Sequence, residues 1–192
     1  MKKRIMLSST SHRLRHVARI LRRGGVIAYP TEAVYGLGCD PWNRAAVYRL
    51  LAIKQREVAK GLILIASDVG QLAPFVAALP AARMAEIMSS WPGPNTWLLP
   101  ARATTPVWLT GRFETLAVRV TAHPLAAALC QVYGGAIVST SANRSDRPPA
   151  HTANRVRMAF GDALDAILCG PCRGADRPSV IRDGATGRVL RI

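Results

Sequence analysis

The spacing of hydrophobic residues predicts both helices and strands along this chain. Apolar side chains recur at i, i+3, i+4 and i+7 between Leu14 and Leu21, which predicts a helix over residues 11–23. Arginines occupy its opposite side and form either a solvated face or a surface for phosphate. Similar spacings, with Asn43 as one helix cap, predict further helices over residues 43–54, 68–77, 81–90, 124–133 and 152–160.

Short apolar runs between glycine, proline or polar residues predict the strands. Residues 62–66 are continuously apolar, as expected for a central strand buried on both faces. Because no internal repeat or long linker interrupts the alternation, we expect one α/β domain over residues 1–192, with its core from about residue 11 and a mixed sheet. The other predicted strands cover residues 26–29, 97–100, 115–120 and 164–168, a segment after Gly135, and a pair around Asp183-Gly184.

One segment combines a strand with small polar residues at its end. A glycine pair precedes the strand 26–29, and Pro30 ends the ladder because it has no N–H. Thr31, Glu32 and a glycine-containing loop at 35–38 follow. Such a strand end is a common ligand site on an α/β sheet, although a tight turn between two elements has the same composition.

A second segment, residues 134–143, repeats this design. In extended backbone Ser139, Ser141 and Asn143 point to one side of the chain. Three short hydrogen-bonding side chains in a row at a strand end favour a ligand cradle. Serines that are bonded to neighbouring backbone are the alternative.

The predicted strand 115–120 has two different faces. Its even-numbered residues face the predicted core, while Thr115, Ala117 and Arg119 share the other face. An arginine in this position needs an anionic partner, because a buried charge is costly without one. Either a bound anion or one of the eleven acidic residues of the chain can provide that partner.

The composition adds a strongly basic character. A formal net charge of +15 over 192 residues implies an anionic partner such as a nucleotide or a nucleic acid. Only four of the 26 basic residues are lysines, and two of these, Lys54 and Lys60, flank Arg56. If the backbone from Lys54 to Arg56 is extended, both side chains point the same way, and together with Lys60 they suit a polyphosphate.

Several other functions are disfavoured by the sequence. The N-terminal segment is too poor in apolar residues for a signal peptide, and no run approaches the roughly 18 apolar residues of a membrane span. Four cysteines without a secretory signal suggest a reducing, cytoplasmic setting. Cys169 and Cys172 have a redox spacing but lie in a late loop, and His12 with His16 lacks a third metal ligand.

Five motifs occur in a characteristic order along the chain. They are Tyr29–Glu32 with Tyr35–Gly38, Lys54-x-Arg56, Trp91–Pro94, Leu116–Val120 and Ser139–Asn143. Each motif is weak alone, but together and with these spacings they resemble the YrdC-like family in its short, single-domain form. The resemblance extends from about residue 11 to the end of the sequence.

The resemblance implies a fold and an activity. The fold is a twisted mixed sheet with flanking helices, curved around a concave basic cavity. The activity is the condensation of L-threonine, bicarbonate and ATP into threonylcarbamoyl-adenylate and pyrophosphate, with Mg²⁺ on the ATP phosphates and no tightly bound cofactor. A partner transferase complex then carries the group to tRNA as N6-threonylcarbamoyladenosine, and the basic surface could also dock tRNA or RNA.

The resemblance also assigns ligands to the motif residues. The expected ATP ligands, of which the first two are also expected to be catalytic, are Lys54, Arg56, Lys60, Thr115, Ser141 and Asn143. The expected threonine ligands are Thr31, Arg119, Ser139 and Ser179. Glu32 has either a catalytic part or only orients its loop. Asn95, Asp146 and Val180 depart from the family pattern, but none of them removes a charged site residue.

Two other functions are compatible with parts of the sequence. An RNA-binding module would explain the charge and the arginine-rich first helix, but it needs an exposed basic face with stacking aromatics, and aromatic residues are few. The same scaffold could also hydrolyse or carbamoylate a different substrate, because related domains occur in carbamoyl-transfer maturation enzymes. The absence of acylphosphatase-like and zinc-finger segments argues against this third function.

Overall fold

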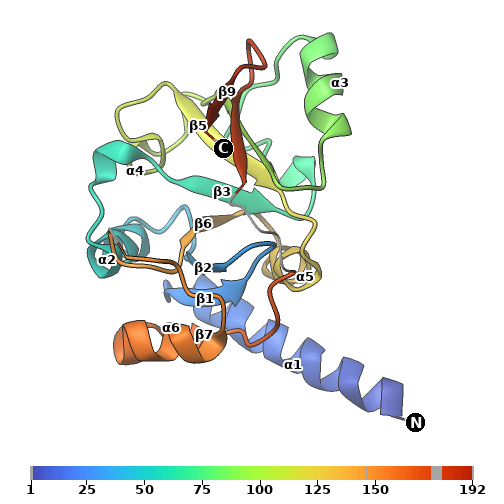
Figure 1. Cartoon of the computed structure of the whole chain (residues 1–192). Coiled ribbons are helices and arrows are strands. Elements are labelled where there is room, and N and C mark those ends of the chain that lie inside the picture. The colour runs from blue at the N-terminus through green and yellow to red at the C-terminus, as the bar shows by residue number, and fades with distance from the viewer. Residues whose placement is uncertain (1, 146, 174–178, 192) are drawn as a thin grey trace.

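The fold is built on a nine-stranded mixed sheet with the strand order β7-β1-β2-β6-β3-β5-β4-β8-β9 (Figure 1). The computed structural model describes residues 2–145, 147–173 and 179–191. The strands are β1 (Ile27–Pro30), β2 (Tyr35–Gly38), β3 (Ile63–Ala66), β4 (Asn95–Pro100), β5 (Thr115–Val120), β6 (Ile137–Ser141), β7 (Ala166–Ile167), β8 (Val180–Asp183) and β9 (Val189–Arg191). The helices are α1 (Lys2–Arg22), α2 (Arg44–Lys54), α3 (Ala81–Ser89), α4 (Val107–Thr110), α5 (Pro124–Tyr133) and α6 (Ala153–Phe160).

Different helices cover the two faces of the sheet. The helices α1 and α5 pack against each other and bury Leu21 and Leu129 on one face, together with Ile65 of β3 (Figure 1). Helix α2 buries Leu50 on the other face, in the same cluster as Leu64 of β3. Successive residues of the central strand β3 thus face opposite layers, as predicted for a strand buried on both faces. The arrangement confirms the predicted α/β class and the mixed sheet.

Residues 35–38 form a strand, so the prediction of a glycine-containing loop at this position is wrong. The strand β2 pairs antiparallel with β1, which ends at Pro30 as predicted. A Cβ atom on Gly38 would lie 2.5 Å from a backbone oxygen of β6 and 2.8 Å from the Tyr29 ring, and one on Gly36 would lie 3.2 Å from that ring. Both glycines are therefore required by the close packing of the buried Tyr29 ring and not by an unusual backbone dihedral angle.

Two helix predictions need correction. Helix α1 begins at Lys2 and not near Ser11, because no proline or glycine interrupts the residues before Ser11. Residues 68–77 contain only the short 3₁₀ turn η2 (Val69–Gln71). Pro74 has no N–H to donate within a helix, and Val76 instead forms a bridge with the residue after β4.

The remaining predicted elements are confirmed with small shifts at their ends. Asn43 caps α2 through its side chain, which accepts a hydrogen bond from the N–H of Ala46, and α5 has the predicted bounds. Strand β7 is shorter than predicted, and α4 and the 3₁₀ turns η1 (Val58–Lys60) and η3 (Gly161–Ala163) were not predicted. Asp146 and residues 177–178 of the predicted C-terminal strands lie outside the described residues. None of the described helices is long and apolar enough to cross a membrane.

Candidate active site

A cavity of about 430 Å³ lies beside the β1–β2 hairpin and the end of β6. Residues from β3, β5 and β9 complete its wall. It brings together six of the predicted ligands, which are Thr31, Arg56, Arg119, Ser139, Ser141 and Ser179. Segments that are far apart in the sequence therefore meet in one place, as the predicted alternation of β5 and β6 requires.

Four other predicted ligands are described but do not line this cavity. Thr115 is the first residue of β5 and pairs with the last residue of β4. Lys60 is exposed, and its Nζ lies 3.9 Å from an Oε1 of Glu57. Asn143 borders a separate hollow of about 760 Å³ on the outer side of the segment that follows β6. The fourth residue, Lys54, lies buried below that segment.

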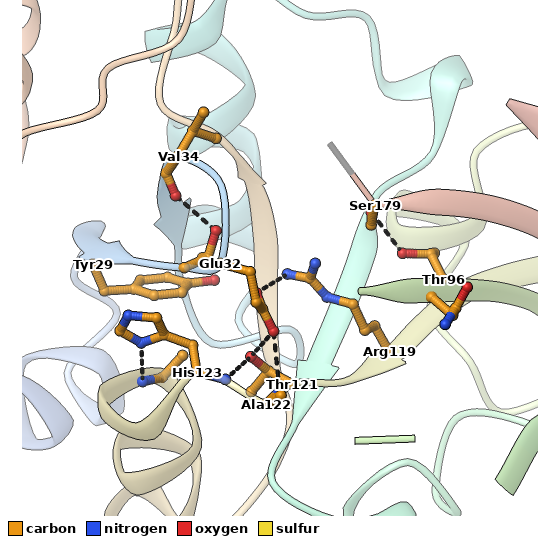
Figure 2. A network of polar contacts seen from close by, with 12 residues as sticks. Tyr29, Glu32, Val34, Thr96, Arg119, Thr121, Ala122, His123 and Ser179 are labelled. Atoms are coloured by element: carbon orange, nitrogen blue, oxygen red, sulfur yellow. Dashed lines mark hydrogen bonds and ion pairs between the residues drawn. The ribbon is translucent and has the colours of Figure 1, made fainter. Parts of the chain in front are cut away.

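The cavity wall contains a buried ion pair. Arg119 of β5 is 8% exposed, and its Nη2 lies 3.4 Å from Oε2 of Glu32 (Figure 2). The other carboxylate oxygen of Glu32 accepts hydrogen bonds from Thr121 Oγ1 at 2.8 Å and from the backbone N–H of Ala122 at 3.0 Å. Burial alone would raise the pKa of Glu32, but the charge of Arg119 and these hydrogen bonds lower it below its usual value. The pair is therefore ionised.

Hydroxyl groups surround this ion pair. The hydroxyl of Thr31 donates to the backbone oxygen of Val34 at 2.6 Å and so closes the loop between β1 and β2. Thr96 donates to Oγ of Ser179 at 3.0 Å (Figure 2). With Ser139 on the same cavity wall, this part of the cavity combines one cation, one carboxylate and several hydroxyls. Such a set suits a small zwitterion with a hydroxyl group.

Lys54 is held in a different way from the other predicted phosphate ligands. It is the last residue of α2, and Gln55 follows in the left-handed conformation with φ of 55°. The backbone from Lys54 to Arg56 is therefore not extended, and the condition under which both side chains would point the same way is not met. The ammonium group of Lys54 donates to the backbone oxygens of Ser141 at 2.5 Å and Asn143 at 2.8 Å, and to Oδ1 of Asn143 at 3.1 Å. Burial, and secondly the charge of Arg56, lower the pKa of Lys54 to about 8.

Two further arginines, Arg56 and Arg191, line the cavity. Arg56 donates to the backbone oxygen of Gly61 at 3.0 Å, while its buried Nε has no hydrogen-bond partner among the described residues. Burial, and secondly the charge of Arg191, lower the pKa of Arg56. Arg191 also lines the cavity, from β9. Two like charges that are close enough to affect one another form a site for an anion.

Sequence patterns did not identify Arg191 as a residue of this site, and they left the partner of Arg119 open. The sequence around Arg191 contains no motif that indicates a ligand site. Arg191 reaches the cavity only because its strand, β9, joins the edge of the sheet. The pairing of Glu32 with Arg119 was only one of two possibilities for Arg119. The signal that could have found it was the position of Glu32 at a strand end, combined with the need of Arg119 for an anionic partner.

The Cys169–Cys172 segment makes structural contacts. The backbone oxygen of Gly170 accepts a hydrogen bond from the Tyr35 hydroxyl at 2.5 Å. The backbone oxygen of Pro171 accepts one from Nε2 of His123 at 3.0 Å. All four cysteines of the chain are free. Within the part of the chain that the structure describes, no three His, Cys, Asp or Glu side chains are grouped as a metal site.

Comparisons with known proteins agree with this geometry. The family model Sua5_yciO_yrdC, described as telomere recombination, matches residues 19–192. A threonylcarbamoyl-AMP synthase of Nitrosococcus oceani is 58% identical over 179 residues, which cover 93% of this chain and 97% of that protein. Its counterpart in Pseudomonas aeruginosa strain UCBPP-PA14 is 53% identical over 182 residues, which cover 95% of this chain and 98% of that protein.

A solved structure of P. abyssi Sua5 complexed with L-threonine is also similar. It superposes with a TM-score of 0.84 at 32% sequence identity over 88% of this chain. The match covers 50% of the Sua5 chain, so the present chain spans half of that protein's length.

Proposed function

The chain belongs to the Sua5/YciO/YrdC family, and we propose that it is an enzyme that makes threonylcarbamoyl-AMP and pyrophosphate from L-threonine, bicarbonate and ATP. The product serves the synthesis of N6-threonylcarbamoyladenosine in tRNA. The chain is thus a nucleotidyltransferase, and the cavity beside β6 is its active site.

One observation carries this proposal: a single cavity is lined both by an ion-paired arginine with several hydroxyl groups and by two further arginines. Arg119 and the surrounding hydroxyls provide a site for the carboxylate and hydroxyl of threonine. Arg56 and Arg191, which line the same cavity, provide a site for phosphates. The reaction needs both substrates in one cavity because a carbamate made on the amino acid must reach the α-phosphorus of ATP.

The chemistry requires alignment more than a covalent nucleophile. The amine of threonine attacks bicarbonate, and water leaves as the carbamate forms. A carbamate oxygen then attacks the α-phosphorus, and pyrophosphate leaves with its bonding electron pair. Such a phosphoryl transfer is accelerated by positioning and by cations that stabilise the developing charge. Arg119 orients threonine, and Arg56 with Arg191 stabilises the phosphates.

Among the other predicted ATP ligands, Ser141 keeps its role in this proposal and Lys54 takes a structural one. Ser141 contacts the nucleotide from the cavity wall, and Lys54 holds the backbone that carries Ser141 and Asn143. Lys60 and Thr115 stay predicted ATP ligands. Mg²⁺ would come with the triphosphate and not be held by a carboxylate of the protein. Glu32 is the only carboxylate among the described lining residues, and it already contacts Arg119 and Thr121.

The product also implies partners and a place of action. Threonylcarbamoyl-AMP is an activated acyl phosphate, so an enzyme that transfers its acyl group to the adenosine of tRNA has to follow. We therefore propose a transferase complex as the consumer of the product, tRNA or RNA as a ligand of the basic surface, and the cytoplasm as the place of action.

The decisive measurement is pyrophosphate release by the purified protein with ATP and Mg²⁺. Release that requires both L-threonine and bicarbonate, with threonylcarbamoyl-AMP identified by mass, supports the proposal. Matched reactions with L-serine and with no amino acid serve as controls. Release that is independent of threonine, or binding of RNA without any adenylate formation, contradicts it.

A further inference from the structure

We infer that Glu32 is a positioning residue, which holds the Arg119 guanidinium in the orientation that receives the carboxylate of the substrate amino acid. This inference rests on the proposed function and assigns a role to a side chain that the sequence left open. It concerns the affinity for one substrate only. Glu32 acts through Arg119 and not on the reacting atoms.

The geometry places Glu32 between two elements of the site. Glu32 lies in the loop after β1, next to Thr31, while Arg119 lies on β5 (Figure 2). Oε1 of Glu32 is fixed by Thr121 and Ala122, which directly follow β5. Strand β5 therefore provides both the cation and the hydrogen bonds that hold its counter-ion. Through Glu32, the loop that carries Thr31 is tied to the strand that carries Arg119.

Hydrogen bonds satisfy some polar atoms of this ion pair and leave others without a partner among the described residues. Oε2 of Glu32 and Nε of Arg119 are both buried, and neither has a hydrogen-bond partner among the residues that the structure describes. The side chains of both residues are 9% exposed. Buried polar atoms are normally paired, so an unpaired N–H on a guanidinium that lines a cavity indicates a missing acceptor. A substrate carboxylate is such an acceptor.

In a purely structural ion pair, we would expect hydrogen bonds to all buried donors and acceptors of both side chains. Buried ion pairs are stable when hydrogen bonds satisfy the remaining donors and acceptors of both groups. Here Oε1 of Glu32 accepts two hydrogen bonds, whereas the buried Nε of Arg119, a residue that lines the cavity, has no hydrogen-bond partner among the described residues. Glu32 thus fixes one side of the guanidinium and leaves another side for a ligand. Pre-organisation of this kind lowers the ordering cost when the substrate binds.

Threonine binding and turnover in Glu32→Gln test the inference. The amide keeps the size of the side chain but loses the charge that holds Arg119. We expect the threonine KM and the calorimetric threonine Kd to rise about tenfold, the effect of one misaligned charge-assisted hydrogen bond. The ATP KM should stay unchanged. Glu86→Gln, which removes an exposed carboxylate from its ion pair with Arg83, is the matched control and should change none of these values.

Two further comparisons separate positioning from a general structural role. Binding of threoninamide, which lacks the carboxylate, should be equally weak in the wild type and in Glu32→Gln. In an Arg119→Ala background, Glu32→Gln should cause no additional loss of threonine affinity, because the residue through which it acts is gone. Equal losses in both backgrounds, or an unchanged or tighter threonine Kd in Glu32→Gln, would overturn the inference.

A second variant covers the case in which Glu32→Gln does not fold. Thr121→Val removes one hydrogen bond to Oε1 and leaves both charges in place. It should raise the threonine KM about threefold, and this effect should also vanish in the Arg119→Ala background. An unchanged threonine KM in a folded Thr121→Val enzyme overturns the inference. If the wild-type enzyme releases pyrophosphate without threonine, the proposed function itself has failed, which is a distinguishable result.

Discussion

Arg119 and Lys54 are two buried cations at the same site, and the protein satisfies them in opposite ways. Arg119 is paired with a carboxylate and keeps an unpaired donor at the cavity. Lys54 has no carboxylate partner among the described residues, and its ammonium donates to three oxygens of Ser141, the last residue of β6, and of Asn143. The two residues were predicted as equivalent ligand-binding cations, one for each substrate.

The difference distinguishes a cation that binds a substrate from a cation that stabilises the structure of the site. A guanidinium has five donors and can serve a structural partner and a ligand at the same time. An ammonium has three donors, and Lys54 has a backbone or side-chain oxygen for each of them. We therefore expect changes at Arg119 to act on one substrate, and changes at Lys54 to act on the whole segment from Ser141 to Asn143 and on stability.

The largest effect is expected for Lys54→Ala. The variant leaves the backbone oxygens of Ser141 and Asn143 without their buried donor, so the free energy of unfolding should fall by about 2–3 kcal/mol. For a chain of this size the melting temperature should fall by about 5–10 °C. Pyrophosphate release should be abolished at temperatures where the variant is still folded. A folded Lys54→Ala variant with wild-type turnover would contradict the proposal that Lys54 stabilises the segment from Ser141 to Asn143.

Arg119→Ala is expected to have a large effect on one substrate only. The threonine KM should rise about 50-fold, because a charge-assisted contact to the carboxylate is lost, while the ATP KM stays within about twofold. Steady-state pyrophosphate release at varied threonine and at varied ATP measures both values. A matched rise of both KM values, or an unchanged threonine KM, would show that Arg119 does not bind threonine.

A smaller effect is expected from the titration of Lys54. Its ammonium is charged below a pKa of about 8 and is increasingly neutral above it, so the hydrogen bonds that hold Ser141 and Asn143 weaken as the pH rises. The affinity for ATP should therefore fall about tenfold between pH 7 and pH 9. Calorimetry of ATP without threonine avoids titration of the threonine amine. In Lys54→Arg, whose guanidinium stays charged, the affinity should not change over this range.

Several features of the fold could be predicted because they depend on local sequence. The cap at Asn43, the proline at the start of α5 and the apolar run at 62–66 each act within a few residues. Leu72 and Phe75 in the wrongly predicted helix 68–77 are buried, although these residues do not form a helix. Apolar spacing reports which side chains are buried, and a helix additionally requires backbone donors that Pro74 does not have.

The site could be predicted in part, for a similar reason. The alternation of β5 and β6 correctly placed Arg119, Ser139 and Ser141 on the cavity side. The burial of Lys54 could not be predicted, because its ammonium contacts oxygens of Ser141 and Asn143, which are distant in the sequence. The contribution of Arg191 depends on strand order alone. Properties that arise only when distant strands meet left no local trace in the sequence.

The strand order also determines when the site is assembled during translation. Strand β6 lies between β2 and β3, so the hairpin β1–β2 and the strand β3 emerge from the ribosome with open edges until residues 137–141 follow. The cavity wall then still lacks β9 with Arg191, close to the C-terminal end of the sequence. The first half of the chain carries Thr31 and Arg56 but cannot form the cavity alone. The wall of this cavity is therefore completed only after β9 has been synthesised and has joined the sheet.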